Sequence, residues 1–268
     1  MRRKLIIGLC ILVVLLAGIG IYLRNGFYGN CVLERRSLYV RSGSEYRTLE
    51  DSLDAAIAHT AFFRFYACHI ELDRSFKPGH YVLEPGMNVV QVARMLKLGL
   101  QTPVRVTINN VRTPAQLAGK LARQIEADSA TIVGALTDPA TARKAGFDSV
   151  TLFSMFIPDT YEFYWTVSPA QFIERMRREY DRFWTPQRDA KRQRSGLSRL
   201  EVMTLASIVY EETRQSDEMP RIAGVYINRL RKGWPLQADP TVKYALQEFG
   251  LRRILHRHLK YPSPYNTY

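Results

Sequence analysis

Leu5-Ile-Ile-Gly-Leu-Cys-Ile-Leu-Val-Val-Leu-Leu-Ala-Gly-Ile-Gly-Ile-Tyr-Leu23 is an uncharged apolar run near the start of the chain. A run of roughly 19 such residues, as a helix, crosses the hydrocarbon core of a bilayer. Arg2, Arg3 and Lys4 precede it and Arg24 follows it, so the positive flank predicts a cytoplasmic N-terminus. A cleaved signal peptide is the alternative, but the run is long for one and no Ala-x-Ala site follows.

Composition predicts a folded domain on the far side of the membrane. The chain has 268 residues, of which 46% are hydrophobic and 24% charged, as in ordinary globular proteins. The net charge of +13 fits anionic lipid headgroups or an anionic cell-wall polymer, or else a solvated basic face without a partner. An exported domain makes nucleic acid an unsuitable partner. Three cysteines exclude a dense disulfide framework, and they leave Cys31 and Cys68 either bridged or reduced.

Three segments share an order of short strand, turn and amphipathic helix: 38–53, 81–96 and 104–121. Thr48, Asn88 and Thr113 are the expected N-caps of their helices. Apolar side chains then recur at helical spacing, as from Val89 to Leu96. Segments this short do not bury a core alone, so we expect them to pack together as small α+β modules.

The middle of the chain predicts helices around one aromatic segment. Residues 128–150 have weak helical signals, and 169–183 form a long basic amphipathic pattern. Between them, Phe156 to Trp165 surround the turn Pro158-Asp-Thr160 with five aromatic residues. Aromatic residues at this density indicate a buried core or, alternatively, a sugar-binding wall.

The stretch Ser198-Arg-Leu-Glu201 has the pattern of a capping box, which predicts a helix over 199–213. At 100° per residue one apolar stripe forms, containing Val202, Leu205, Ala206 and Val209. The same wheel places Glu211 in solvent and Glu212 on the flank of the stripe, half buried. Burial would raise the pKa of Glu212, as a general acid requires near neutral pH. The alternative is that Glu212 is an ordinary surface glutamate.

Polar and aromatic turns follow a second helical period at 221–231. The turn at 233–241 offers Gln237, Asp239 and Thr241, whose side chains suit the hydroxyl and amide groups of a sugar. The last turn, Ser263 to Tyr268, is polar and aromatic. The five histidines are scattered, and no phosphate loop or Ser or Cys nucleophile motif is present. The sequence therefore predicts neither a metal site nor a cofactor.

Several strings resemble the endolytic murein transglycosylases of the MltG/YceG-like type. They are Leu205 to Thr213, Ile222 to Leu230, Pro235 to Val242 and Tyr265-Asn-Thr-Tyr268, with Phe76 to Tyr81 and Pro158 to Tyr161 upstream. The resemblance implies an α+β fold: a cytoplasmic stub and transmembrane helix (1–26), LysM-like α+β modules (27–125) and a mixed α+β catalytic domain (126–268). It also implies a single-pass protein of the bacterial cell inner membrane with a periplasmic catalytic domain.

The resemblance implies cleavage of nascent peptidoglycan strands with Glu212 as the catalytic residue. The substrate-binding residues it suggests are Glu218, Asn228, Gln237, Asp239, Thr241, Tyr265 and Asn266. The implied partners are glycan strands, the inner membrane and cell-wall synthesis proteins, and no metal is implied. Two alternatives are a non-catalytic, membrane-anchored peptidoglycan-binding protein and a membrane scaffold for wall synthesis.

Two departures from the family pattern matter. Relatives often carry a glutamate where this chain has Tyr210, which would change how the catalytic pKa is set. In the family a further segment follows the Tyr-Asn-Thr-Tyr string, whereas this sequence stops at Tyr268. We therefore expect a fragment or a truncated relative. The helix of Glu212, the turn at 233–241 and the last turn are expected to converge on one cleft, of which the family's further segment supplies one wall. We expect weak or no lytic activity until that segment is restored.

Overall fold

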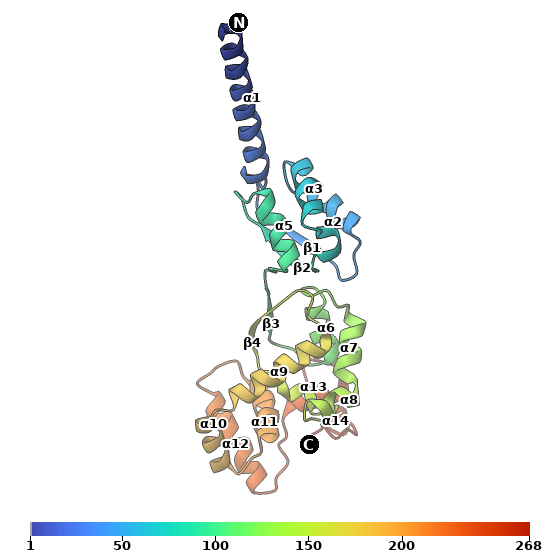
Figure 1. The fold of residues 1–268 in the computed structure, drawn as a ribbon. Helices are drawn as coiled ribbons and strands as arrows, with labels where there is room; N and C mark the ends of the chain where they lie inside the picture. Colours follow the sequence, from blue (N-terminus) through green and yellow to red (C-terminus); the bar gives the residue numbers. More distant parts are fainter. Residues whose placement is uncertain (1) are drawn as a thin grey trace. The chain divides into compact units, whose positions relative to one another are not determined.

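The computed structural model describes residues 2–268 (Figure 1). Met1, the first residue of the predicted cytoplasmic stub, lies outside the described residues. The chain divides into two compact units. The first unit contains the residues up to Thr107 together with Gly119–Ser129 and Thr160–Ser168; the second contains Ile108–Ala118, Ala130–Asp159 and Pro169–Tyr268. The expected domain limits at residues 26 and 125 stay predictions.

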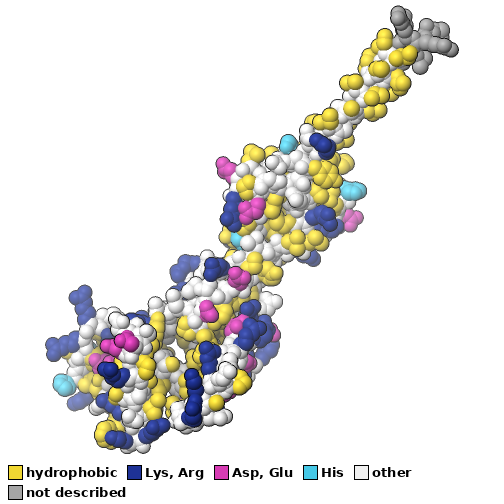
Figure 2. Space-filling model, turned by 90° about the vertical axis from the view of Figure 1, so that its left-hand side faces the viewer, with side chains coloured by type: hydrophobic (Ala, Val, Ile, Leu, Met, Phe, Trp, Pro, Cys, Tyr) yellow, Lys and Arg dark blue, Asp and Glu magenta, His cyan; other side chains and the backbone are white. Residues whose placement is uncertain are grey.

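The first helix, α1 (Arg2–Tyr28), contains the apolar run. Within the described part of the chain, Ile6–Tyr28 is the one helical segment long and apolar enough to cross a membrane. In Figure 2 most of the coloured side chains on the visible face of this segment are apolar. The expected end of the run at Arg24 is not the end of the helix, which continues to Tyr28. Arginine has a high helix propensity, so a charge that ends an apolar run need not end the helix.

A two-stranded antiparallel sheet lies at the centre of the first unit. β1 (Arg36–Val40) pairs with β2 (Gly79–Leu83), with Leu38 opposite Tyr81. Besides α1, four helices surround this sheet in the sequence of the unit: α2 (Tyr46–Asp54), α3 (Thr60–His69), α4 (Leu72–Ser75) and α5 (Val89–Leu98). The predicted strand–helix pairs at 38–53 and 81–96 are confirmed as α+β structure. Their LysM-like identity stays a prediction.

The predicted helix caps have different outcomes. Asn88 caps α5, and Gln91 completes a capping box with it. Thr113 accepts a hydrogen bond from the Gln116 amide at the start of α6 (Pro114–Leu121), as expected. Thr48 is wrong as a cap, because it lies inside α2, which begins at Tyr46. Glu45 occupies the N-cap position instead, and the helix begins at Tyr46, whose ring packs against the core.

The aromatic segment becomes a strand with a buried side. β4 (Asp159–Phe163) pairs with β3 (Val104–Ile108) in a second two-stranded sheet. Tyr161 and Phe163 are buried, as is Phe156 just after the short 3-10 helix η1 (Leu152–Met155). For these three residues the core interpretation is confirmed.

The rest of the chain is mainly helical, whereas a mixed α+β domain was predicted for it; the predicted helices in it are α9, α11 and α12. The helices are α7 (Ser129–Thr137), α8 (Pro139–Lys144), α9 (Pro169–Phe183), α10 (Pro186–Ser195), α11 (Arg199–Glu212), α12 (Met219–Arg231), α13 (Asp239–Leu246) and α14 (His256–Leu259). The bounds of α9 agree with the expected 169–183. Helix α12 begins two residues before the expected Arg221, and α13 was not expected.

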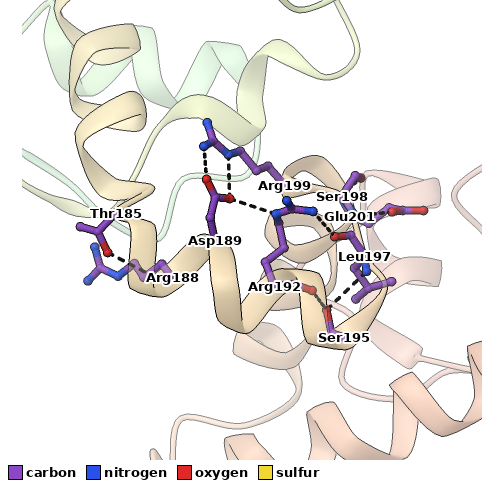
Figure 3. Close-up of polar contacts among 9 residues, drawn as sticks. All are labelled: Thr185, Arg188, Asp189, Arg192, Ser195, Leu197, Ser198, Arg199 and Glu201. Atoms are coloured by element: carbon purple, nitrogen blue, oxygen red, sulfur yellow. Dashed lines mark hydrogen bonds and ion pairs between the residues drawn. The ribbon is translucent and has the colours of Figure 1, made fainter.

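A cluster of arginines around one aspartate fixes the start of α11 (Figure 3). Asp189 of α10 accepts hydrogen bonds from Arg192 and from Arg199, the first residue of α11. Arg192 also donates to the carbonyl of Leu197 in the connection between the helices, at 2.8 Å. Hydrogen bonds from Arg199 and Arg192 lower the pKa of Asp189 to about 2. The direction in which α11 leaves this connection is therefore set by charge-assisted hydrogen bonds.

The cysteines are free thiols among the described residues. Cys31 is fully buried, and burial raises the pKa of its thiol to about 11. A thiol held in the protonated form inside a core has a packing role and is a poor nucleophile.

Candidate active site

Glu212 lies at the C-terminal end of α11. The predicted capping box starts this helix: the Glu201 amide donates to Ser198 Oγ at 3.2 Å, and the Ser198 amide donates to Glu201 Oε2 at 2.7 Å. Leu205 and Val209 are then buried in a small core. Seven residues after Leu205, Glu212 returns to within about 20° of the same direction. Its side chain thus follows the buried stripe but lies beyond the core, where it is exposed.

The expected burial of the two neighbouring glutamates is reversed. The side chain of Glu211 is 27% exposed, and Arg112 donates to its Oε2 through Nε at 3.1 Å and NH2 at 2.7 Å. Arg214 approaches the other oxygen at 3.4 Å. Arg112 belongs to the loop before α6, so a segment distant in sequence covers Glu211. Helical periodicity describes the faces of α11 and contains no information about that loop.

Tyr226 of α12 connects Glu212 to the core. This residue is 5% exposed, and it packs with Leu205 and Val209. Its phenol lies close enough to Glu212 to interact with that carboxylate electrostatically. Burial raises the pKa of Tyr226, and the charge of Glu212 raises it further. The phenol therefore stays protonated at neutral pH and keeps its hydroxyl proton beside the Glu212 carboxylate.

A second tyrosine–carboxylate pair lies beside the first. The Tyr268 hydroxyl donates to Asp239 Oδ1 at 2.6 Å. Burial, followed by the hydrogen bond to Asp239 and the charge of that carboxylate, raises the pKa of Tyr268 to about 12. Smaller contributions come from Glu212 and Tyr226, so the four groups are close enough to interact electrostatically.

Thr267 joins the last turn of the chain to the start of α13. Its carbonyl accepts from the Gln237 amide at 2.9 Å, and its Oγ1 accepts from the Ala238 amide at 3.1 Å. The hydroxyl also pairs with Thr241 Oγ1 at 2.9 Å. The end of α11, the turn before α13 and the Tyr-Asn-Thr-Tyr string therefore converge, as the sequence predicts.

Two of the predicted substrate-binding side chains are engaged within the fold. Thr241 is buried, and its hydroxyl donates to the Ala238 carbonyl at 2.7 Å. The Asn266 amide donates to the carbonyls of Leu259 at 2.8 Å and Tyr261 at 2.9 Å. These contacts give both residues a structural role in holding the two turns.

The other predicted binding residues differ in position. Gln237 and Asp239 are exposed beside the tyrosines, and Tyr265 is exposed with its ring edge-to-face on Tyr244 at 5.0 Å. Thr213, the residue directly after Glu212, donates through its Oγ1 to Glu218 at 2.7 Å.

Asn228 lies away from this cluster. It is exposed and two residues after Tyr226 on α12, so it points to nearly the opposite side of that helix.

Sequence reasoning missed Tyr226, Thr267 and Tyr268 as site residues. Tyr226 occupies a position in the apolar period of α12, and a buried tyrosine needs a partner for its hydroxyl. That need is a usable signal, although it does not identify the partner. The contacts of Thr267 and Tyr268 join residues 26 to 30 positions apart and have no local pattern.

A separate open groove of about 730 Å³ contains none of the predicted site residues. Its arginines are Arg143, Arg177, Arg192 and Arg199. Arg177 pairs with Asp181, and the last two pair with Asp189. Since three of the four arginines are already engaged in ion pairs within the fold, the groove mainly reflects how α9, α10 and α11 meet.

Comparison with known proteins places this arrangement in a family. The sequence model of the YceG-like family matches residues 38–268, which include every residue of the site. This chain belongs to the YceG-like family. Its relatives include a protein of Bacillus subtilis strain 168, named endolytic murein transglycosylase, with 26% identity over 72% of this chain and 58% of the relative. A protein of Streptococcus pneumoniae strain D39 has the same name, with 23% identity over 85% of this chain and 47% of the relative.

A solved structure of the family has a similar fold. A putative YceG-like protein from Listeria monocytogenes superposes with a TM-score of 0.56 at 25% identity, over 87% of this chain and 82% of the other. The chain spans about half the length of the curated relatives it matches.

Proposed function

We propose that this YceG-like chain carries the catalytic part of an endolytic peptidoglycan lytic transglycosylase. The observation that carries the proposal is the position of Glu212, exposed at the end of a fixed helix with the buried phenol of Tyr226 close by. The Asp239–Tyr268 pair lies beside it. The names of the two curated relatives support the same substrate and reaction class.

The reaction is cleavage of the β-1,4 bond between N-acetylmuramic acid and N-acetylglucosamine without water. Protonated Glu212 gives its proton to the glycosidic oxygen as the bond from C1 breaks. The Glu212 carboxylate then takes the proton of the muramic C6 hydroxyl, whose oxygen bonds to C1. Glu212 ends as it began, and the product carries a 1,6-anhydro ring.

One carboxylate is sufficient for this chemistry. Ordinary glycosidases need a second carboxylate as nucleophile or to activate water. Here the C6 hydroxyl is the nucleophile, and its attachment to the sugar supplies the proximity that the reaction requires. Asp239 already accepts from Tyr268, which suits a group that orients substrate.

Helix α1 is the proposed membrane anchor. With the N-terminus in the cytoplasm, the catalytic part lies in the periplasm, where nascent glycan strands leave the inner membrane. Cell-wall synthesis proteins are the proposed partners. The high positive charge of the chain favours a surface facing anionic wall material.

The test compares Glu212→Gln with Glu211→Gln in the full-length protein. Gln at 212 removes the transferable proton, so we expect release of anhydro-muropeptides from purified murein to fall by about 100-fold or more. Gln at 211 weakens the contact with Arg112, so we expect a lower Tm with most activity kept. Binding to intact sacculi should survive both changes. Equal loss of activity in the two variants would contradict the role of Glu212.

A further inference from the structure

The last two turns of α1 are packed into the first unit. Gly26 is buried, and a Cβ at this position would overlap the ring of Phe62 on α3. The Phe62 ring also lies edge-on to Tyr22, with centroids 5.3 Å apart, and to Phe27 at 5.0 Å. Removing α1 would expose this cluster, so the helix is a structural part of the unit and its loss by cleavage is disfavoured.

These contacts fix the depth of α3 relative to the apolar segment. Ile6–Tyr28 has 23 residues and is about 34 Å long, slightly more than the roughly 30 Å of a hydrocarbon core. Arg24 marks the level of the headgroups, because arginine side chains reach towards them from a helix end. Tyr22 lies two residues, about 3 Å, on the membrane side of Arg24. Phe62, which contacts Tyr22, therefore lies at the membrane boundary.

The face of α3 next to α1 is apolar and exposed. Phe65 follows Phe62 by one helical turn and is 68% exposed. Tyr28 is 65% and Leu33 75% exposed. In contrast, Arg64 turns towards α2 and donates to Glu50 at 3.0 Å and to Asp54. Aromatic rings at the level of an apolar span match the aromatic belts found at membrane interfaces.

We propose that α3 is an interfacial helix, with Phe62 and Phe65 placed among the lipid headgroups beside Tyr28. The first unit then rests on the outer bilayer surface and is held there by α1 and by the aromatic face of α3. Its partner is the bilayer itself, because the apolar face continues directly from the proposed span. This inference rests on the proposed anchoring by α1 and is independent of the chemistry of Glu212.

The experiment places one added tryptophan at each of three sites and measures quenching by lipids brominated near the headgroup. The full-length protein is reconstituted in liposomes, and the emission of the wild-type protein with its three tryptophans is subtracted. Phe65→Trp reports the proposed surface, and Leu16→Trp reports insertion of α1. Leu98→Trp is the matched control, since Leu98 is also exposed and lies at the end of α5, about 14 Å from Val89. A β-bridge between Asn30 and Asn88 holds the start of α5 close to the end of α1, so Leu98 is at the end of α5 that is farther from this bridge.

We expect brominated lipid to lower the added emission at least twofold for Phe65→Trp and to leave that of Leu98→Trp nearly unchanged. Lipid brominated near the chain ends should quench Leu16→Trp more than Phe65→Trp. Quenching at 16 without quenching at 65 contradicts the interfacial role of α3 and leaves the anchor intact. No quenching at 16 contradicts the anchor and the inference together. Equal quenching at 65 and 98 indicates general adsorption and also overturns the proposal.

Discussion

Glu211 and Glu212 are adjacent in sequence and have different partners. Glu211 is held by Arg112 and Arg214, whereas Glu212 has the phenol of Tyr226. The hydrogen bonds from Arg112 occupy one oxygen of Glu211, and Arg214 approaches the other, so the side chain is engaged within the fold. A carboxyl that meets one protonated phenol at an open surface remains available to a substrate. The partners, and not burial, distinguish the proposed acid from its neighbour.

Tyr226→Phe tests this contact at the residue scale. The change removes the hydroxyl beside Glu212 and keeps the ring in the core, so we expect a Tm close to that of the wild-type protein. If the phenol positions Glu212 against the substrate, its loss should lower kcat by about tenfold, or about 1.4 kcal/mol in the activation free energy. Tyr210→Phe is the control, since its hydroxyl donates to Asn110 at 3.1 Å. An unchanged kcat and pH profile in Tyr226→Phe would show that the phenol has no part in positioning Glu212.

The sequence identifies Glu212 but not its surroundings. The family strings and the wheel both select Glu212, but the half burial that the wheel predicts for it is wrong, since its side chain is exposed. Predicted burial did not distinguish the two glutamates correctly, because Arg112, which is 99 positions away in the sequence, covers Glu211. Tyr268 is paired with Asp239 across 29 positions, which no local period encodes.

At the scale of elements, the link between α10 and α11 determines where Glu212 is held. Asp189 is ionised above its folded pKa of about 2, whereas an ordinary aspartate has a pKa near 3.8. A lowered folded pKa contributes stability above pH 4, and this contribution disappears as the pH falls from about 4 towards 2.

Asp189→Asn removes that pH-dependent contribution. We expect the variant to have a lower Tm than the wild-type protein at pH 6, and the difference to shrink as the pH falls through 4 towards 2. The check is thermal unfolding in detergent across that range. Glu174→Gln is the control, because Glu174 forms an exposed i,i+4 pair with Arg178 that should contribute little at any pH. A constant difference between Asp189→Asn and wild type at all pH values would rule out the ion-pair explanation.

Local signals predicted some elements well and others poorly. The basic amphipathic pattern gave α9 its observed bounds, and the capping box gave the start of α11. The start of α2 was missed because Tyr46 packs against the core. Helix α13 was read as a turn since it begins with Asp239-Pro-Thr241, a sequence that suits turns and first helical turns equally.

At the scale of the whole molecule, the proposal requires the chain beyond α1 to be exported. Alkaline phosphatase fused after Tyr268 should be active in intact cells, because this enzyme folds only outside the cytoplasm. Deleting residues 5–23 removes the apolar run and should abolish that activity at equal expression. An inactive fusion to the intact chain would contradict the predicted topology.

The central claim is that the glycan is cleaved without water. The new chain end of the product distinguishes this reaction from hydrolysis. The measurement is digestion of purified murein by the full-length protein in water labelled with heavy oxygen, followed by mass spectrometry of the new chain ends. The account predicts 1,6-anhydro ends that contain no label, and their loss in Glu212→Gln. Reducing ends that carry the heavy oxygen would show hydrolysis and contradict the account.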